Sequence, residues 1–155
     1  MFGVVAVEVK YQQELISYAR NEIEPLAELE WEESGHPTET LVIDWDSYFA
    51  LEEVGRLKCF TARKDGALVG YFILMVSKSI HYSDHLFAVN DVIFVKPDSR
   101  AGATGYKLIK YAEEYCKEIG VSVLTLNTKV HIPFDTLMVH MGFELIERVY
   151  SKFLG

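Results

Sequence analysis

The stretch from Asp91 to Gly120 constrains the fold most, because it predicts a strand, a tight loop and a helix in direct succession. Residues 92–95 form a short run of β-branched and aromatic residues, and Pro97 ends it because proline cannot continue a strand ladder. After the small residues of 101–105, apolar residues recur every three or four positions, which places them on one face of a helix ending at Gly120. They are Leu108, Ile109, Ala112, Cys116 and Ile119.

The loop between this strand and this helix predicts an anion-binding site. The first N–H groups of a helix have no partner inside it and lie at the positive end of its dipole, and small side chains let a ligand approach the backbone. Two common phosphate loops do not fit. A P-loop needs Gly-Lys-Ser/Thr, but Tyr106 follows Gly105, and the dinucleotide fingerprint needs three glycines where only Gly102 and Gly105 occur.

The remaining segments predict an α/β protein with a mixed, mostly antiparallel sheet flanked by helices, in a single domain over residues 1–155. Lys64-Asp65-Gly66 joins two strand-like runs, and Asp-Gly is a strong hairpin signal. We expect three successive antiparallel strands before the loop and one parallel neighbour after it. The predicted strands are 3–9, 57–63, 67–77, 85–95, 121–126 and one or two within 143–153. The predicted helices are 12–31, bent or broken at Pro25, then a short one capped by Asp44 or Asp46, and one from Pro133 to Gly142.

Composition narrows the function classes. The chain is 50% hydrophobic and 25% charged, and no apolar run approaches the roughly 20 residues that span a bilayer, so we expect a cytoplasmic protein without a membrane partner. The net charge of −8 argues against a nucleic-acid partner and favours cationic ones. Cys59 and Cys116 have no CxxC spacing, and His81 and His85 flank Asp84 without a third ligand, so no metal site is expected.

Ile93-Phe94-Val95-Lys96-Pro97 followed by Arg100 to Gly105 resembles the motif of the GNAT superfamily of N-acetyltransferases. That motif is an aliphatic-x-Val-x-Pro strand end followed by Arg/Gln-x-x-Gly-x-Gly/Ala, and Ala103 replaces its first glycine. The order of elements also resembles the GNAT fold over nearly the whole chain, and segment 137–143 is similar to its helix and Gly-Phe step. Residues 67–105 are most similar to small acetyltransferases of bacteriophages.

The resemblance implies acetyl-CoA as co-substrate. Its pyrophosphate would bind the loop backbone, with added charge from Arg100 and Lys107, and a bulge near Ile93 to Val95 would splay the strand and receive the pantetheine. Asn127 either binds the cofactor or caps the end of its strand. The cofactor-binding residues implied are Ile93, Phe94, Val95, Arg100, Ala101, Gly102, Ala103, Thr104, Gly105, Asn127, Phe134 and Met138.

Acyl transfer to an amine requires a neutral nitrogen and a destination for its proton. Asp91, with Asn90 beside it, lies where several GNAT members carry a carboxylate or another hydrogen-bonding base, so it is either the base or water-orienting group or a solvated, structurally paired aspartate. The tyrosine that protonates the leaving thiolate in many members corresponds here to Met138. A thiol of pKa about 8.5 can leave without an acid. His131, His140 and Tyr150 are substitutes only by proximity in sequence.

We therefore expect an acetyl-CoA-dependent N-acetyltransferase that works by direct transfer in a ternary complex. The acceptor is a small amine, a polyamine, or a protein lysine or N-terminus. The acidic run from Asn21 to Glu33 either attracts a cationic acceptor or is an ordinary solvated helix face. Ala103 and Met138 leave open the alternative of a CoA-binding or protein-interaction module that has lost catalysis. A homodimer is also left open.

Overall fold

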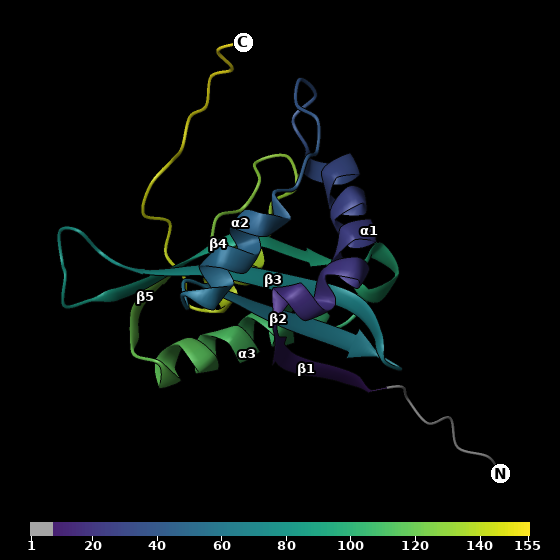
Figure 1. Cartoon of the computed structure of the whole chain (residues 1–155), viewed down its shortest axis with the longest axis horizontal. Helices are drawn as coiled ribbons and strands as arrows, with labels where there is room; N and C mark the ends of the chain where they lie inside the picture. Colours follow the sequence, from purple (N-terminus) through teal and green to yellow (C-terminus); the bar gives the residue numbers. More distant parts are fainter. Residues whose placement is uncertain (1–7) are drawn as a thin grey trace.

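Five strands form one sheet, in the order β1-β2-β3-β4-β5 (Figure 1). The structure, a computed structural model, describes residues 8–155, so the strand predicted at 3–9 lies almost wholly outside the described residues. Strands β1 to β4 pair antiparallel and β4 pairs with β5 parallel, which confirms the predicted mixed α/β architecture. The strands are β1 Val9–Glu14, β2 Leu57–Lys64, β3 Ala67–Lys78, β4 Leu86–Val95 and β5 Val121–Thr125. The helices are α1 Ile16–Ser34, α2 Trp45–Glu53, α3 Thr104–Glu118 and α4 Asp135–His140, with a 3-10 turn at Pro97–Ser99.

The helices cover the two faces of the sheet separately. Helices α1 and α2 pack on one face, and α3 packs on the other together with Met138 of α4. The central strand β3 is apolar on both sides because it supplies both cores. Leu68, Tyr71 and Ile73 face α1 and α2, whereas Val69, Phe72 and Leu74 face α3, and a register shift against β2 at Val69 interrupts the alternation.

The predicted hairpin is confirmed between β2 and β3. Asp65 has a φ of 53° and Gly66 a φ of 77°, so both central residues are in the left-handed region that a two-residue turn of type I′ requires. This turn fixes the register of the strands that lead to the loop after β4.

The first helix differs from the predicted range of 12–31 at both ends, since it ends at Ser34 and begins four residues later than predicted. Helix α1 begins at Ile16 rather than Gln12, because Gln12 to Glu14 complete β1 by pairing with Thr61 to Cys59. It is one helix with Pro25 inside it, not two. Buried residues continue past the proline along one face, so packing on the sheet holds the helix together. They are Ile16, Ala19, Ile23, Leu26 and Ala27.

The predicted strand or strands within 143–153 are wrong, because this segment contains no strand. Gly142, with a φ of 88°, ends the turn after α4, and the chain then runs away from the sheet (Figure 1). The pattern that suggested a strand is a mixture of apolar and polar residues without a covered face, since Leu145, Val149 and Tyr150 are all exposed. Near its end, the Phe153 ring lies 6.4 Å from the His36 ring.

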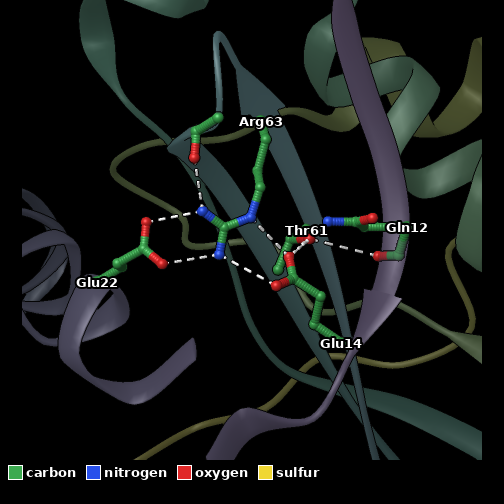
Figure 2. Close-up of polar contacts among 6 residues, drawn as sticks. Gln12, Glu14, Glu22, Thr61 and Arg63 are labelled. Atoms are coloured by element: carbon green, nitrogen blue, oxygen red, sulfur yellow. Dashed lines mark hydrogen bonds and ion pairs between the residues drawn. The ribbon is translucent and has the colours of Figure 1, made fainter. Parts of the chain in front are cut away.

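Arg63 anchors α1 to the sheet (Figure 2). Its guanidinium donates to both oxygens of Glu14 on β1, at 2.9 and 3.0 Å, and to both oxygens of Glu22 on α1, at 2.8 and 2.7 Å. The remaining N–H bonds the Gly66 carbonyl at 2.8 Å. Every guanidinium donor is therefore used, and the ion pairs join a strand pair to the helix that forms one wall of the site described below.

Candidate active site

The parallel strands β4 and β5 pair only over the first part of β4 and then separate. Their last paired residues are Val89 and Thr125. Just beyond, the Asn90 side chain accepts a hydrogen bond from the Asn127 N–H at 2.7 Å and donates one to the Asn127 carbonyl at 3.1 Å. From Asp91 to Val95, β4 therefore has no strand partner on this side among the described residues. Asn90 and Asn127 close the ladder at the base of the resulting opening.

A β-bulge lies at Asp91. On β3, Ile73 pairs with Val92 while the next residue, Leu74, pairs with Asn90, so Asp91 is the extra residue of β4. This corrects the expected bulge position near Ile93 to Val95, since the register from Val92 onward is regular. The reason is local: only Asp91 has no opposite residue on β3.

The bulge decides which way Asp91 faces. Val92 and Phe94 pack toward α1 and α2, so strict alternation would turn Asp91 toward α3. Instead its side chain meets α2, where the Tyr48 hydroxyl donates a hydrogen bond to Asp91 Oδ2. The bulge thus places a carboxylate on the α1–α2 side of the sheet, beside the point where β4 and β5 part.

Helix α2 holds Tyr48 at this position. The Asp44 carboxylate caps the helix by accepting a hydrogen bond from the Ser47 N–H at 3.0 Å, which confirms one of the two predicted caps. One turn later, the Tyr48 ring lies 5.9 Å from the ring of the buried Trp45. Burial and then the bond to Asp91 raise the pKa of Tyr48, so its hydroxyl stays protonated.

The charge of Glu30 acts on Tyr48 and on the buried Tyr71. Burial raises the pKa of the Tyr71 hydroxyl, and the next largest cause is the charge of Glu30, followed by Tyr48, Cys59 and Asp91. Glu30 is half-buried on α1 and accepts a hydrogen bond from the Ser34 hydroxyl. Two carboxylates, Glu30 and Asp91, therefore act on the same pair of tyrosines from different elements.

The loop after β4 is open to a ligand. Gly102 has a φ of 118°, and a Cβ added at Gly102 or Gly105 would meet no atom within 4 Å. Lys107 is the first residue of α3 whose N–H reaches a backbone acceptor, the Ala103 carbonyl at 2.8 Å. Within residues 8–155 the N–H groups of 101–106 have no backbone acceptor, so the loop presents unpaired donors with free space above them.

Arg100 is engaged elsewhere than expected. Its Nε donates to the Val95 carbonyl at 2.7 Å, its Nη2 lies 2.8 Å from Glu33 of α1, and the guanidinium carbon lies 5.3 Å from the centre of the Phe94 ring. The guanidinium therefore braces α1 against the end of β4. Lys107 is exposed and has no ion-pair partner within residues 8–155, so it is the cation free to add charge at the loop.

Comparison with known proteins identifies the family of this chain. The sequence model of the acetyltransferase (GNAT) family matches residues 13–135. The chain belongs to this family. It is an acyl-CoA-dependent N-acetyltransferase, and acetyl-CoA is its co-substrate. A comparison with curated proteins gave no match.

Solved structures share the GNAT fold over nearly the whole chain at low identity. A ribosomal-protein-alanine N-acetyltransferase from Brucella melitensis biovar Abortus 2308 is 20% identical, with a TM-score of 0.71, covering 96% of this chain and 100% of that one. An aminoglycoside N-acetyltransferase in complex with CoA is 19% identical, with a TM-score of 0.72 and 99% of each chain covered. Glucosamine-6-phosphate N-acetyltransferase from Arabidopsis thaliana is 17% identical, with a TM-score of 0.70, covering 96% and 99%.

Several other residues predicted for this site are either buried in the core or exposed on loops. Met138 is 7% exposed and packs in the core beneath α3, with the half-buried Phe134 against the same core. Thr104 is also buried. His131 is exposed in the loop before α4, and Tyr150 is 88% exposed on the C-terminal segment. Neither hydrogen-bonds to Asp91 in the part of the chain that the structure describes.

Sequence reasoning missed Tyr48 and isolated no single glutamate of α1. No local motif marks Tyr48, which lies 43 residues before its partner Asp91. The only available signal was the capped short helix that carries it.

No helix within residues 8–155 has both the length and the apolar character needed to cross a membrane. The same residues contain no group of three or more His, Cys, Asp or Glu side chains placed to hold a metal ion.

Proposed function

We propose that this GNAT enzyme transfers the acetyl group of acetyl-CoA directly to a cationic primary amine, with Asp91 accepting the proton that the amine loses. The observation that carries the proposal is the bulge at Asp91. It turns a carboxylate toward α1 and α2 at the level where β4 and β5 separate. A proton acceptor is needed where acyl donor and amine meet.

The chain's own groups fit acetyl-CoA in two places. The unpaired N–H groups around residues 101–106, with Lys107 one turn into α3, fit the negative charge and acceptor oxygens of a diphosphate. The edge of β4 from Asp91 to Val95 that faces β5 has no strand partner among the described residues, so it can bond an amide-bearing chain as a neighbouring strand would. Bound there, acetyl-CoA supplies an activated thioester carbonyl to the amine.

Asp91 is suited to the proton transfer although a carboxylate is a weak base. The ammonium first releases one proton to solvent, which gives its nitrogen a lone pair, and the nitrogen then becomes far more acidic as its bond to the carbonyl carbon forms, so that a second proton must leave. A nearby carboxylate, directly or through a water, can take the proton at that stage. Met138 is buried and has no proton to donate, so we propose that the thiol, of pKa about 8.5, leaves as its thiolate.

The acidic side of the opening supports a cationic acceptor. Glu30 and Asp91 both act on Tyr48 and Tyr71, and the attraction of a unit charge pair near a protein surface is about 4 kcal/mol at 4 Å before desolvation and screening. The structural relatives are named for different acceptors: an alanine of a ribosomal protein, glucosamine-6-phosphate, and aminoglycosides, one of them in complex with sisomicin. The acceptor is therefore argued from these carboxylates rather than from the fold.

Replacing Asp91 with Asn tests this function. Asp91→Asn keeps the shape and removes the base, so kcat should fall by about 10² or more while the KM for acetyl-CoA changes little. Asp84→Asn, at an exposed turn, is the matched control and should leave both unchanged. Unchanged turnover in Asp91→Asn would assign the proton elsewhere. Retained acetyl-CoA with no thiol release from the unmodified enzyme, across a broad panel of amines and peptides, would instead indicate a binding module.

A further inference from the structure

We propose that Tyr48 is a positioning residue that fixes the Asp91 carboxylate in its working orientation. Its hydroxyl holds Oδ2, which leaves Oδ1 as the oxygen presented to the acceptor amine. The inference rests on the proposed role of Asp91 and adds the group that makes this role possible.

The first argument is that Asp91 needs an external support. It is the extra residue of the bulge and has no opposite residue on β3, so the strand ladder constrains it less than its neighbours. Within residues 8–155, the Tyr48 hydroxyl is the only hydrogen-bond donor to its carboxylate. Without this bond the carboxylate could rotate, and a small misplacement of a catalytic group is costly in rate.

The second argument is that Tyr48 is itself held firmly. Its ring packs against the ring of Trp45, which is 8% exposed and lies on the same helix, α2. The guanidinium carbon of Arg20, on α1, lies 5.1 Å from the centre of the Trp45 ring. The cap by Asp44 fixes the start of the same helix. A side chain with two rotatable bonds, supported in this way, delivers its hydroxyl to one place.

The third argument concerns the direction of the hydrogen bond. Burial and the neighbouring Asp91 raise the pKa of Tyr48, so the phenol keeps its proton and donates a hydrogen bond to the carboxylate. Tyr48 therefore does not exchange a proton with the substrate. It acts through Asp91, and its effect should disappear when the carboxylate is absent.

A double-mutant cycle tests this inference. Tyr48→Phe keeps the ring and its packing but removes the hydroxyl, so kcat should fall about tenfold, the effect of losing roughly one hydrogen bond to a charged group. The KM for acetyl-CoA should not change. In the Asp91→Asn background, the same substitution should change kcat less than about twofold, because there is no carboxylate left to position.

Controls separate this effect from loss of structure. Tyr18→Phe, on the exposed side of α1, removes a hydroxyl that has no role here and should leave kcat unchanged. Thermal unfolding checks that Tyr48→Phe is folded. If Phe destabilises α2, a fluorinated tyrosine at position 48 supplies a second variant, since it changes the acidity of the hydroxyl with little change in packing.

Two results would overturn the inference on its own. One is a kcat of Tyr48→Phe equal to that of the unmodified enzyme. The other is an equal fall in kcat with and without the Asp91 carboxylate, which would mean that the Tyr48 hydroxyl acts independently of Asp91. If Asp91→Asn itself leaves kcat unchanged, the proposed function fails, and the inference fails with it. If Asp91→Asn is strongly impaired but the two substitutions are independent, only the role of Tyr48 is refuted.

Discussion

Arg63 offers the most direct test of how this sheet holds α1, and Arg63→Met is the change that tests it. Methionine keeps much of the length and the apolar stem but removes all five donated hydrogen bonds. Glu14, whose side chain is 8% exposed, would then keep only uncharged partners such as the Thr61 hydroxyl among the described residues. The substitution therefore leaves a buried carboxylate without its cation.

The expected magnitude follows from the exposure of the two carboxylates. Removing one partner of a buried ion pair costs about 3–5 kcal/mol, whereas an exposed pair contributes about 0–1 kcal/mol. The Glu22 side chain is 45% exposed and can regain water, so most of the loss comes from Glu14. We expect Arg63→Met to lose about 3 kcal/mol, which for a chain of this size lowers the Tm by roughly 6–12 °C.

Urea unfolding and thermal unfolding of the full chain measure this loss. Glu22→Gln is the matched control at the exposed partner and should cost less than about 1 kcal/mol. The double variant Glu14→Met/Arg63→Met should be more stable than Arg63→Met alone, because it removes the carboxylate left unpaired. A Tm of Arg63→Met within about 2 °C of the unmodified chain, or a double variant less stable than the single one, would refute this reasoning.

The stability that Arg63→Met loses should depend on pH in a definite direction. Hydrogen bonds from Arg63 lower the pKa of Glu22. Burial alone would raise the pKa of Glu14, but hydrogen bonds from Arg63 and Thr61 together hold it below its ordinary value of 4.5. Their stabilisation is therefore present above about pH 4.5 and disappears as the pH falls through the lowered folded values. In Arg63→Met burial remains without the cation, so the stability gap between the two proteins should narrow as the pH falls from 6 toward 4, about the range in which carboxylates titrate.

Two further predictions concern the ligand sites. Gly105→Glu should abolish acetyl-CoA binding through bulk and like charge, while Gly105→Ala, whose added Cβ meets no atom within 4 Å, should bind nearly as well as the unmodified enzyme in calorimetry; survival of binding in the Glu variant would contradict the anion site. Glu30→Gln should raise the KM of a cationic acceptor several-fold, more at low salt, whereas Glu28→Gln on the exposed face should not; an equal rise in both variants, or no salt-dependent rise in Glu30→Gln, would refute a specific role of Glu30.

The fold was predictable where single residues carry strong local information. Asp65 and Gly66 supply the two left-handed residues of the β2–β3 turn, so the antiparallel strands around this turn were predictable from the sequence. Pro97, the small residues of 101–105 and the apolar stripe of α3 fixed the strand-loop-helix unit in the same way. The ends of elements were less predictable, because whether residues 12–14 extend a strand or start a helix depends on β2, which lies nearly fifty residues away.

The site was predictable only in part, because its key feature is a register shift. Asp91 was identified by its place on the strand, but its direction depends on which β3 residue faces Asn90 and which faces Val92. No property of residues 90–92 alone determines this. The partner of Asp91 comes from a short helix in the first half of the chain, so Tyr48 could not be assigned without the packing of α2 on the sheet.

The number of acidic residues in the sequence of α1 overstates the negative charge that is available to a ligand. In the acidic run from Asn21 to Glu33, Glu22 is paired with Arg63 and Glu33 with Arg100. Each ion pair neutralises one cation and one anion, and it ties α1 either to the sheet or to the loop after β4. Of the run, Glu30 is the residue whose charge acts on the tyrosines beside Asp91. An acceptor cation would therefore be recognised by a few carboxylates in fixed places, which predicts selectivity for the spacing between amines more than for total positive charge.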